Sequence, residues 1–442
     1  MTDNELRTVV EGRVWLPGDE DFDRARQAWN LTVEQPVAAV VEARDIDDVV
    51  ALVRYAGRTG ATVTVQPNGH GASGNAESAI LLRTNRFDEI SIDPDRRVAR
   101  VGAGVSWGRL LAAAEPHGLI GLAGSSPVVS VVGYTLGGGM SWFGRKYGLA
   151  SDSVRAFDVV DADGNQAHVT AESDAELFWA LRGGGGDLAI VTALEFELYP
   201  APNLYGGHIM WSDDHSQEVL AAYLEIIRQA PPELSVWINR LKFPGAPGII
   251  AIAVTYLGDA VAGQRLLSGL DTIDGVMVDS RGPLAPSNLG AVTSEPTDPG
   301  PGIIRSELLT SLDERTLEVL FTESIEPLIG VQLRHLGGAF TEPTSGAHPA
   351  VAEPFSVYLQ GLGPTPDAAD AVREAQRRII ADLGPRVSGR KPFTSLISGD
   401  TVASTFDDKT VDRLRDLKRI RDPHNIFRAN YPVLPTPLRI VS

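Results

Sequence analysis

The sequence predicts a two-domain protein of the α+β class. Its 442 residues exceed the length of one ordinary domain, so two packed units are the default expectation. An early β-α-β pattern is typical of parallel strands, whereas the later strands alternate apolar and polar residues, as in an antiparallel sheet covered by helices. We place the boundary between the two domains near residue 203, just after Pro200 and Pro202.

The composition excludes several classes of function. A net charge of −18 and a pI of about 4.9 argue against nucleic acid or an anionic membrane as a partner, because those surfaces require clustered Lys and Arg. The absence of cysteine excludes disulfides, cysteine-ligated zinc, iron–sulfur clusters and thiol nucleophiles. The first residues lack the apolar core of a signal peptide, and no apolar run is long enough to span a bilayer. We expect a cytoplasmic protein with a small-molecule substrate and no metal.

The first domain begins with a β-α-β unit. Residues 37–41 form a β-branched run, and Ile46, Val49, Val50 and Val53 make one apolar helical stripe behind Asp45, a residue that can cap the helix. Gly60 stands just past the end of that helix, and residues 62–66 form the next strand. The strands of such a unit run parallel through a right-handed crossover.

A glycine-rich loop follows the second strand, at residues 67–74, with His70 between two glycines. Ligands bind near the carboxyl ends of strands in open α/β sheets, and successive amide groups in such a loop can cradle an anion. The sequence therefore predicts a loop that holds a phosphorylated cofactor bonded to His70. The alternative is an ordinary turn, since short glycine motifs are common.

Two further glycine segments differ in what they indicate. Residues 98–101 form a strand that leads into Gly-x-Gly-x-x-x-Gly at residues 102–108, which is not the dinucleotide-binding spacing, and no acidic residue follows at about 20 positions. That segment predicts a turn into a helix capped by Ser106. Residues 121–140 are the densest glycine region and are too poor in side chains to form a core. They suit close approach of the backbone to a large flat or anionic ligand.

The first domain closes with regular elements. Residues 157–160 and 167–170 form a hairpin, Ser173 and Glu176 fit a capping box for a helix over 174–182, and residues 190–198 alternate as a strand.

In the second domain, predicted helices alternate with predicted strands. The helices lie near residues 214–229, 258–270, 311–328 and 366–383, and the strands near 234–240, 249–256, 330–335 and 355–361. Trp237 and Asn239 share one strand face, as do Tyr358 and Gln360. Aromatic and amide groups on one face suit a wall that contacts substrate, although they also occur as ordinary sheet decoration. Residues 281–302 are rich in Pro and Gly and predict a long loop.

Six motifs in order resemble those of the FAD-linked oxidase superfamily typified by vanillyl-alcohol oxidase. Within it, the sequence is most similar to the berberine bridge enzyme-like and 6-hydroxy-D-nicotine oxidase group. The motifs lie at residues 67–73, 137–139, 145–152, 176–186, 335–339 and 422–427. Each motif is short, but their order covers most of the chain and makes the resemblance specific.

The resemblance implies a PCMH-type FAD-binding domain over residues 1–203, completed by 406–442, and a substrate-binding domain over 204–405. It maps His70 onto the histidine that bonds covalently to the flavin 8α-methyl group. The loop 68–73 would hold the pyrophosphate, residues 126–139 would follow the flavin and ribityl chain, and Asn425 would lie near the pyrimidine edge. The cofactor-binding residues expected from it are Asn68, Gly69, His70, Gly71, Ala72, Ser73, Ser126, Pro127, Val132, Gly133, Gly137, Gly138, Gly139, Tyr147, Asp152, Ile190, Val191 and Asn425.

The chain departs from this family in three places. Ser126 stands where many members have a cysteine that forms a second covalent link, so at most one link, through His70, is possible. Asp187, Leu188 and Ala189 stand where Asn-Phe-Gly is frequent. The tyrosine element that assists the catalytic base in many members has no equivalent near residues 396–402.

The resemblance implies an FAD-dependent oxidase. A carbon that bears a hydroxyl or amine would give hydride to flavin N5, and O2 would then be reduced to H2O2. Alternatives are a dehydrogenase of the same fold with another acceptor, and a flavin- or ligand-binding protein without turnover. The candidates for a base are Tyr358, Asp400, His348 and His335, with Trp237, Asn239 and Gln360 as substrate contacts.

Overall fold

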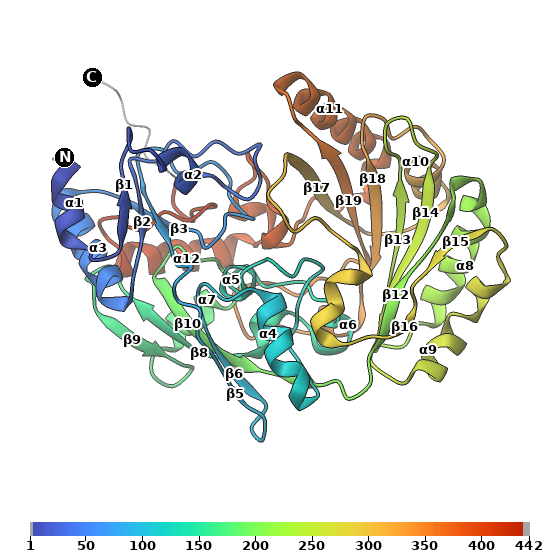
Figure 1. The fold of residues 1–442 in the computed structure, drawn as a ribbon, viewed down its shortest axis with the longest axis horizontal. Coiled ribbons are helices and arrows are strands. Elements are labelled where there is room, and N and C mark those ends of the chain that lie inside the picture. Colours follow the sequence, from blue (N-terminus) through green and yellow to red (C-terminus); the bar gives the residue numbers. More distant parts are fainter. Residues whose placement is uncertain (1–2, 436–442) are drawn as a thin grey trace.

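The predicted β-α-β unit forms at the N-terminal end of the fold (Figure 1). In the computed structural model, which describes residues 3–435, β2 (Ala39–Glu42) and β3 (Val63–Val65) run parallel on either side of β4 (Ile80–Arg83). α3 (Ile46–Thr59) connects β2 to β3 and is capped by the Asp45 carboxylate, and its last turn ends at Gly60 with φ of 70°. Sequence reasoning missed β4, because all four of its residues are buried and show no alternation.

A five-stranded antiparallel sheet completes the sheets of the first region. Its order is β5-β6-β10-β8-β9. The strands are β5 (Ile90–Asp93), β6 (Val98–Gly102), β8 (Val154–Val160), β9 (Gln166–Val169) and β10 (Ile190–Glu197). The predicted hairpin of β8 and β9 is confirmed.

The capping box predicted for α7 (Ala175–Leu181) is wrong. The Asp174 carboxylate caps this helix by accepting from the Leu177 amide at 3.1 Å. The Ser173 hydroxyl instead accepts from the Thr170 amide and donates to the His168 carbonyl, because the turn after β9 uses it locally.

The remaining short elements surround these sheets. They are α1 (Asp3–Val9), β1 (Arg13–Trp15), α2 (Phe22–Arg26), α4 (Trp107–Ala114), β7 (Leu119–Ile120), α5 (Val131–Leu136), α6 (Gly144–Tyr147) and β11 (Tyr199–Pro200). Ser106 stands at the N-cap position of α4, but its side chain makes no capping hydrogen bond. α5 and α6 lie within or beside the densest glycine region, so that region is partly helical.

One large antiparallel sheet organises the second region and confirms the α+β prediction. Its order is β15-β12-β14-β13-β18-β19-β17, with β16 also paired to β12. The strands are β12 (Tyr205–Ser212), β13 (Leu234–Leu241), β14 (Ile249–Tyr256), β15 (Val276–Asp279), β16 (Gly282–Pro283), β17 (Gly302–Leu309), β18 (Gly330–His335) and β19 (Phe355–Leu362).

Four α-helices cover one face of this sheet, and the short 3-10 helix Pro286–Val292 packs against the other. The four α-helices are α8 (Ser216–Gln229), α9 (Ala260–Leu266), α10 (Glu314–Phe321) and α11 (Pro366–Leu383), and they lie on the outer side in Figure 1. Val236, Ile238, Leu333 and Val357 form part of the buried core beneath them. Because side chains alternate along each strand, the neighbouring positions face the opposite way, towards the first region.

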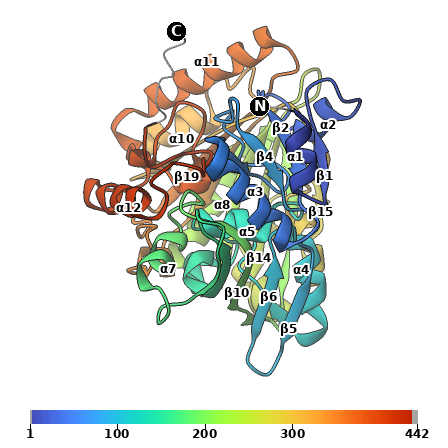
Figure 2. The same cartoon turned by 90° about the vertical axis from the view of Figure 1, so that its left-hand side faces the viewer.

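The C-terminal part of the chain returns to the first region. α12 (Asp408–Arg421) lies beside α7 and the sheets of the N-terminal half (Figures 1 and 2). Val411, Leu414 and Leu417 on α12 are buried in the same core cluster as Phe178 and Leu181 of α7. Across residues 3–435, no helix has both the length and the apolar character that crossing a bilayer requires.

Candidate functional site

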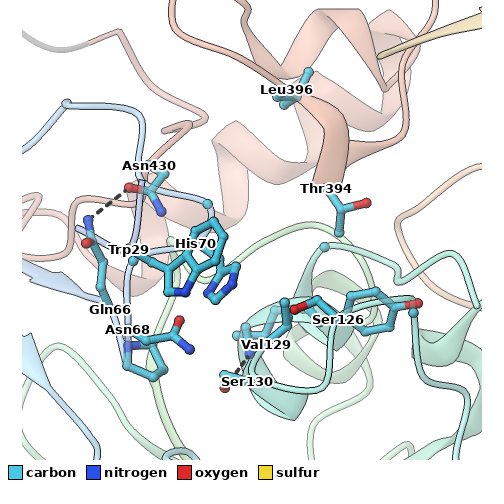
Figure 3. Close-up of a pocket in the computed structure, with 18 of the residues that line it drawn as sticks. Trp29, Gln66, Asn68, His70, Ser126, Val129, Ser130, Thr394, Leu396 and Asn430 are labelled. Carbon is cyan, nitrogen blue, oxygen red and sulfur yellow. Dashed lines mark hydrogen bonds between the residues drawn. The ribbon is translucent and has the colours of Figure 1, made fainter. Parts of the chain in front are cut away.

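A cavity of about 550 Å³ lies between the two regions (Figure 3). The glycine loop after β3, residues 124–137, and the start of β10 form its walls on the side of the first region. β17, β18 and β19 contribute the uncovered face of the large sheet, and residues 393–396 and 427–431 complete the lining. Segments far apart in sequence therefore meet at one cavity.

His70 lies on this cavity as a neutral, unpaired imidazole. Its ring stacks on Trp29 with centroids 4.1 Å apart and planes 20° apart. Both ring nitrogens are buried without a hydrogen-bond partner among the described residues. Burial lowers the pKa of His70 from 6.5 to about 4, so the ring is uncharged near neutral pH and a ring nitrogen retains its lone pair.

A glycine at positive φ and several side-chain hydrogen bonds fix the backbone of this loop. Gly69 has φ of 77°, and a Cβ there would lie 3.0 Å from the Ala28 backbone, so only glycine fits. The Asn68 side-chain amide donates to the Val128 carbonyl at 2.6 Å. The Ser73 hydroxyl donates to the Asn430 carbonyl at 2.7 Å, and Gln66 donates to the Asn430 side chain at 3.2 Å (Figure 3).

The second glycine segment contributes hydroxyl groups. The Ser130 hydroxyl accepts from the Gly133 amide at 3.3 Å and thereby starts α5 at the cavity wall. The hydroxyls of Ser126 and Tyr134 are buried and have no partner within the described chain. Complete burial raises the pKa of Tyr134, so its phenol is neutral and available as a donor.

A buried charged cluster fixes the C-terminal segment against the cavity. The Lys418 ammonium donates to Asp422 at 2.8 Å and to the carbonyls of Asp187 and Phe427 at 2.6 and 2.8 Å. The Asp187 carboxylate accepts from the amides of Ala429 and Val433, each at 3.0 Å. Asp187 therefore orders the backbone on both sides of Asn430.

The structure brings about half of the predicted site residues together. The predicted residues on the cavity are Asn68, Gly69, His70, Gly71, Ser126, Val132, Gly133, Gly137, Ile190, Val191, Tyr358 and Gln360. The others, which do not line it, are Ala72, Ser73, Pro127, Gly138, Gly139, Tyr147, Asp152, Asn425, Trp237, Asn239, Asp400 and His348.

Some predicted cofactor residues act behind the cavity wall instead. Tyr147 stacks on Tyr199 with centroids 4.0 Å apart, and Asp152 pairs with Arg182 at 3.4 Å. A Cβ on Gly138 would lie 2.6 Å from the His348 ring, so this glycine lets the histidine pack against the segment. Asn425 forms a turn with φ of 49° after α12.

Two of the predicted bases, Asp400 and His348, form hydrogen bonds away from the cavity. Asp400 pairs with the Lys391 ammonium at 2.9 Å and accepts from the Ile397 amide. His348 is fully buried: its Nδ1 lies 2.8 Å from the Pro349 carbonyl, and its Nε2 accepts from the Phe393 amide at 3.4 Å. His335 lies 3.3 Å from Arg145 rather than on the cavity. Of the four candidate bases, Tyr358 alone lines the cavity.

Sequence reasoning missed several cavity residues. Among them are Trp29, Gln66, Tyr134, Arg334, Asn430 and Tyr431. Gln66 lies directly before the glycine-rich loop 67–74, and Tyr134 lies within the glycine-rich residues 121–140. Their closeness to these glycines could therefore have identified both as cavity residues. Arg334 stands one residue before the motif at His335, and Asn430 five residues after Asn425. Trp29 belongs to a loop with no pattern of its own.

Unpartnered polar atoms concentrate on this cavity. Eight buried side-chain atoms with no partner among the described residues belong to Trp29, Gln66, His70, Thr84, Trp107, Ser126 and Tyr134, all of which line it. Buried polar groups are normally paired, so this concentration indicates a ligand rich in polar atoms. No cluster of His, Asp and Glu within residues 3–435 has a geometry that could hold a metal ion.

The chain is similar in sequence to FAD-linked enzymes. Residues 37–170 match the family model described as an FAD binding domain. The (R)-6-hydroxynicotine oxidase of Paenarthrobacter nicotinovorans is 29% identical over 96% of this chain and 97% of its own length. The glucooligosaccharide oxidase of Sarocladium strictum is 33% identical over 42% of this chain and 38% of its own.

Solved structures share the fold. The 6-hydroxy-D-nicotine oxidase of Arthrobacter nicotinovorans has a TM-score of 0.85 at 24% identity and covers 97% of this chain and 98% of its own. The berberine bridge enzyme-like protein 1 of Physcomitrella patens has a TM-score of 0.86 at 19% identity, with 99% of this chain and all of its own covered. These likenesses support the two-domain architecture inferred from the sequence.

Proposed function

We propose a reaction for this chain, which belongs to the FAD-linked oxidoreductases of the vanillyl-alcohol oxidase superfamily, in the group that includes 6-hydroxynicotine oxidase and the berberine bridge enzyme-like proteins. The chain is an FAD-dependent enzyme. In the proposed reaction it acts as an oxidase on a small metabolite. It oxidises a carbon that bears a hydroxyl or an amine.

The single observation that carries the cofactor assignment is the set of unpartnered polar atoms on the cavity. FAD presents ribityl hydroxyls, flavin heteroatoms and phosphate oxygens. These match the hydroxyls of Ser126 and Tyr134, the ring N–H of Trp107 and the side-chain oxygen of Gln66. Bound there, FAD would accept hydride from the substrate carbon and deliver the electrons to O2, giving H2O2. A lining that offers both hydrogen-bond donors and acceptors therefore fits FAD, the cofactor of this family.

We assign His70 as the covalent anchor of the cofactor. The neutral ring with two unpartnered nitrogens supports a nitrogen that bonds to carbon, and the Trp29 stack restricts the ring to one orientation. The loop from Asn68 to Ser73 would hold the pyrophosphate, and Ile190 with Val191 would contact the adenosine part. Since the chain has no cysteine, we propose that the link is single.

In this proposal the two regions bind different molecules. Residues 1–203 with 406–442 would bind FAD, and residues 204–405 would bind substrate. Tyr358 and Gln360 on β19 share a sheet face and both line the cavity, which supports contact with substrate. Tyr358 is the proposed acceptor of the substrate hydroxyl proton, which it would take up in its phenolate form, and an amine substrate would need no such group.

Acid precipitation of the purified protein tests the cofactor assignment. Yellow flavin should remain in the denatured pellet, and its fluorescence should persist after washing. A colourless pellet with all flavin in the supernatant overturns the covalent link, and a protein that never contains flavin overturns the proposed function.

Reoxidation separates the oxidase from the dehydrogenase. After photoreduction without air, an oxidase should recover its yellow colour within seconds of mixing with air and should release H2O2. Persistence of the reduced colour for minutes contradicts the oxidase assignment and favours another electron acceptor.

A further inference from the structure

One cation faces the cavity from the large sheet without a matching anion. Arg334 on β18 lines the cavity, and within residues 3–435 its guanidinium forms no ion pair, not even with Glu295 or Asp298, which line the same cavity. A half-buried guanidinium that keeps donors free is suited to a planar anion, which it can bind through two parallel hydrogen bonds.

Arg334 is held rigidly between aromatic rings. Its Cζ lies 3.7 Å from the centroid of the Trp237 ring and 3.8 Å from that of Tyr358. Trp237 pairs directly across the strands with Arg334 and stacks in turn on Trp142, with centroids 3.4 Å apart. Stacking on both faces fixes the plane of the guanidinium, so little conformational entropy is lost when it binds a ligand.

A chain of amides sets the direction of the guanidinium. Its Nε donates to the Gln332 side chain at 2.6 Å, and Gln332 donates to Asn239 at 2.7 Å. The two terminal nitrogens have no hydrogen bond to any described residue, and they are the donors that recognise carboxylates in a bidentate manner. Asn239, a predicted substrate contact, thus acts through Gln332 rather than on the cavity.

Two phenols lie beside this cation. The Tyr134 hydroxyl has no partner among the described residues, and Tyr134, Tyr358 and Arg334 all line the cavity. A guanidinium fork with an adjacent hydroxyl donor, here that of Tyr134, is a carboxylate-binding arrangement.

We propose that Arg334 binds a carboxylate of the substrate, so that the enzyme acts on acids rather than on neutral alcohols or amines. This inference rests on the proposed oxidoreductase function and adds the class of its substrate. Arg334 is a specificity-determining residue that sets which end of the molecule lies at the large sheet.

The test compares benzoate with benzamide, which share shape and differ in charge. Each is titrated into the purified holoenzyme while the flavin absorbance is followed, with ligand-induced thermal shift as a second readout. Benzoate should bind saturably and about tenfold or more tighter than benzamide. Arg334→Gln should remove that preference, and Arg334→Lys should retain part of it, because lysine keeps the charge and loses the fork.

Arg413→Gln is the matched control. Arg413 also stacks on a tryptophan, with its Cζ 3.7 Å from the Trp179 ring, but it lies outside the cavity. This variant should bind benzoate as the wild type does.

Three results would overturn the inference. They are equal binding of benzoate and benzamide, no saturable binding of benzoate, and unchanged benzoate affinity in Arg334→Gln. A changed flavin reduction potential with unchanged benzoate affinity would show that the cation serves the cofactor instead. If the protein contains no flavin, the proposed function fails, and the thermal-shift comparison still decides the carboxylate question.

Discussion

At the scale of single residues, the chemistry of the cavity depends on side chains that lack partners. His70 is the clearest case, because burial removes its charge while the Trp29 stack supplies no hydrogen bond. An unsatisfied buried donor or acceptor costs about 1–3 kcal/mol. Such a cost is accepted at positions where a ligand later forms the missing bond, which is the role proposed for this ring.

Replacing His70 with Ala should abolish covalent attachment. The variant should fold, since a truncated ring leaves no buried polar atom, and it should release its flavin completely into the acid supernatant. The measurement is flavin absorbance in the washed pellet and in the supernatant. His117→Ala, at an exposed histidine, is the control and should retain all its flavin. Flavin that stays bound to the pellet of the His70 variant would refute the assignment.

Tyr358→Phe tests the proposed proton acceptor. On an alcohol substrate, kcat/KM should fall by roughly 10²–10⁴, the range for loss of general base catalysis, with flavin content unchanged. Tyr256→Phe, on β14 of the same sheet and outside the cavity, should behave as the wild type. Unchanged kcat/KM in Tyr358→Phe would exclude this residue as the base.

At the scale of elements, the return of α12 to the first region is what closes the cavity. The residues that follow α12 form a parallel bridge between Phe427 and Val63 of β3, and the Arg428 amide donates to the Val63 carbonyl. Lys418 links this segment to Asp187, which precedes β10. One buried ammonium on α12 therefore joins the segment after the helix to the residues that precede β10, and both that segment and the start of β10 line the cavity.

Lys418→Met should destabilise the protein strongly. Lys418 is fully buried, and its removal leaves the Asp187 and Asp422 carboxylates in the interior without a counter-ion. Breaking such a buried pair costs about 3–5 kcal/mol. Chemical denaturation followed by circular dichroism measures the loss. Arg419→Met removes the adjacent exposed cation and should change the free energy of unfolding by less than about 1 kcal/mol. Equal stability of the two variants would contradict the structural role of the cluster.

Elements with a periodic pattern could be predicted, and elements without one could not. α3 and α11 have amphipathic stripes and caps that the sequence displays, and both were located closely. β4 has four buried residues in a row, and β12 begins with Tyr-Gly-Gly, so neither alternates. Asn425, which the resemblance implied, does not line the cavity, whereas Asn430 does, and the distant Asp187 holds the backbone beside Asn430.

At the scale of the whole molecule, the cavity exists only because the two regions and the C-terminal segment meet. Glycine-rich sequence indicated one wall, at residues 67–74 and 121–140, since backbone approach needs small residues. The opposite wall depends on which face of the large sheet is covered by helices, and that follows from tertiary packing. For this reason the alternation of residues along the strands could not predict that Arg334 stacks on Trp237 and Tyr358 at the cavity.

Stability should fall in acid because histidines are buried in their neutral form. Burial lowers the pKa of His348 from 6.5 to about 4 and that of His335 to about 3, with the charges of Arg390 and Arg145 respectively adding to the effect. Between pH 6.5 and 4 the unfolded chain binds protons that the folded chain does not, so this contribution is complete above pH 6.5 and is lost as the pH falls. Each histidine contributes at most about 1.4 kcal/mol per pH unit in that window.

The acid response should concentrate on the segment that His348 holds. Protonation of Nε2 removes the acceptor for the Phe393 amide, and residues 393–396 line the cavity, so acid should loosen this wall before the rest unfolds. Melting temperature measured from pH 7 to pH 4 should therefore decline less steeply in His348→Asn than in the wild type, although the variant starts lower. His117→Asn, at an exposed site, should leave the slope unchanged. A parallel decline in all three proteins would mean that other groups carry the acid sensitivity of the fold.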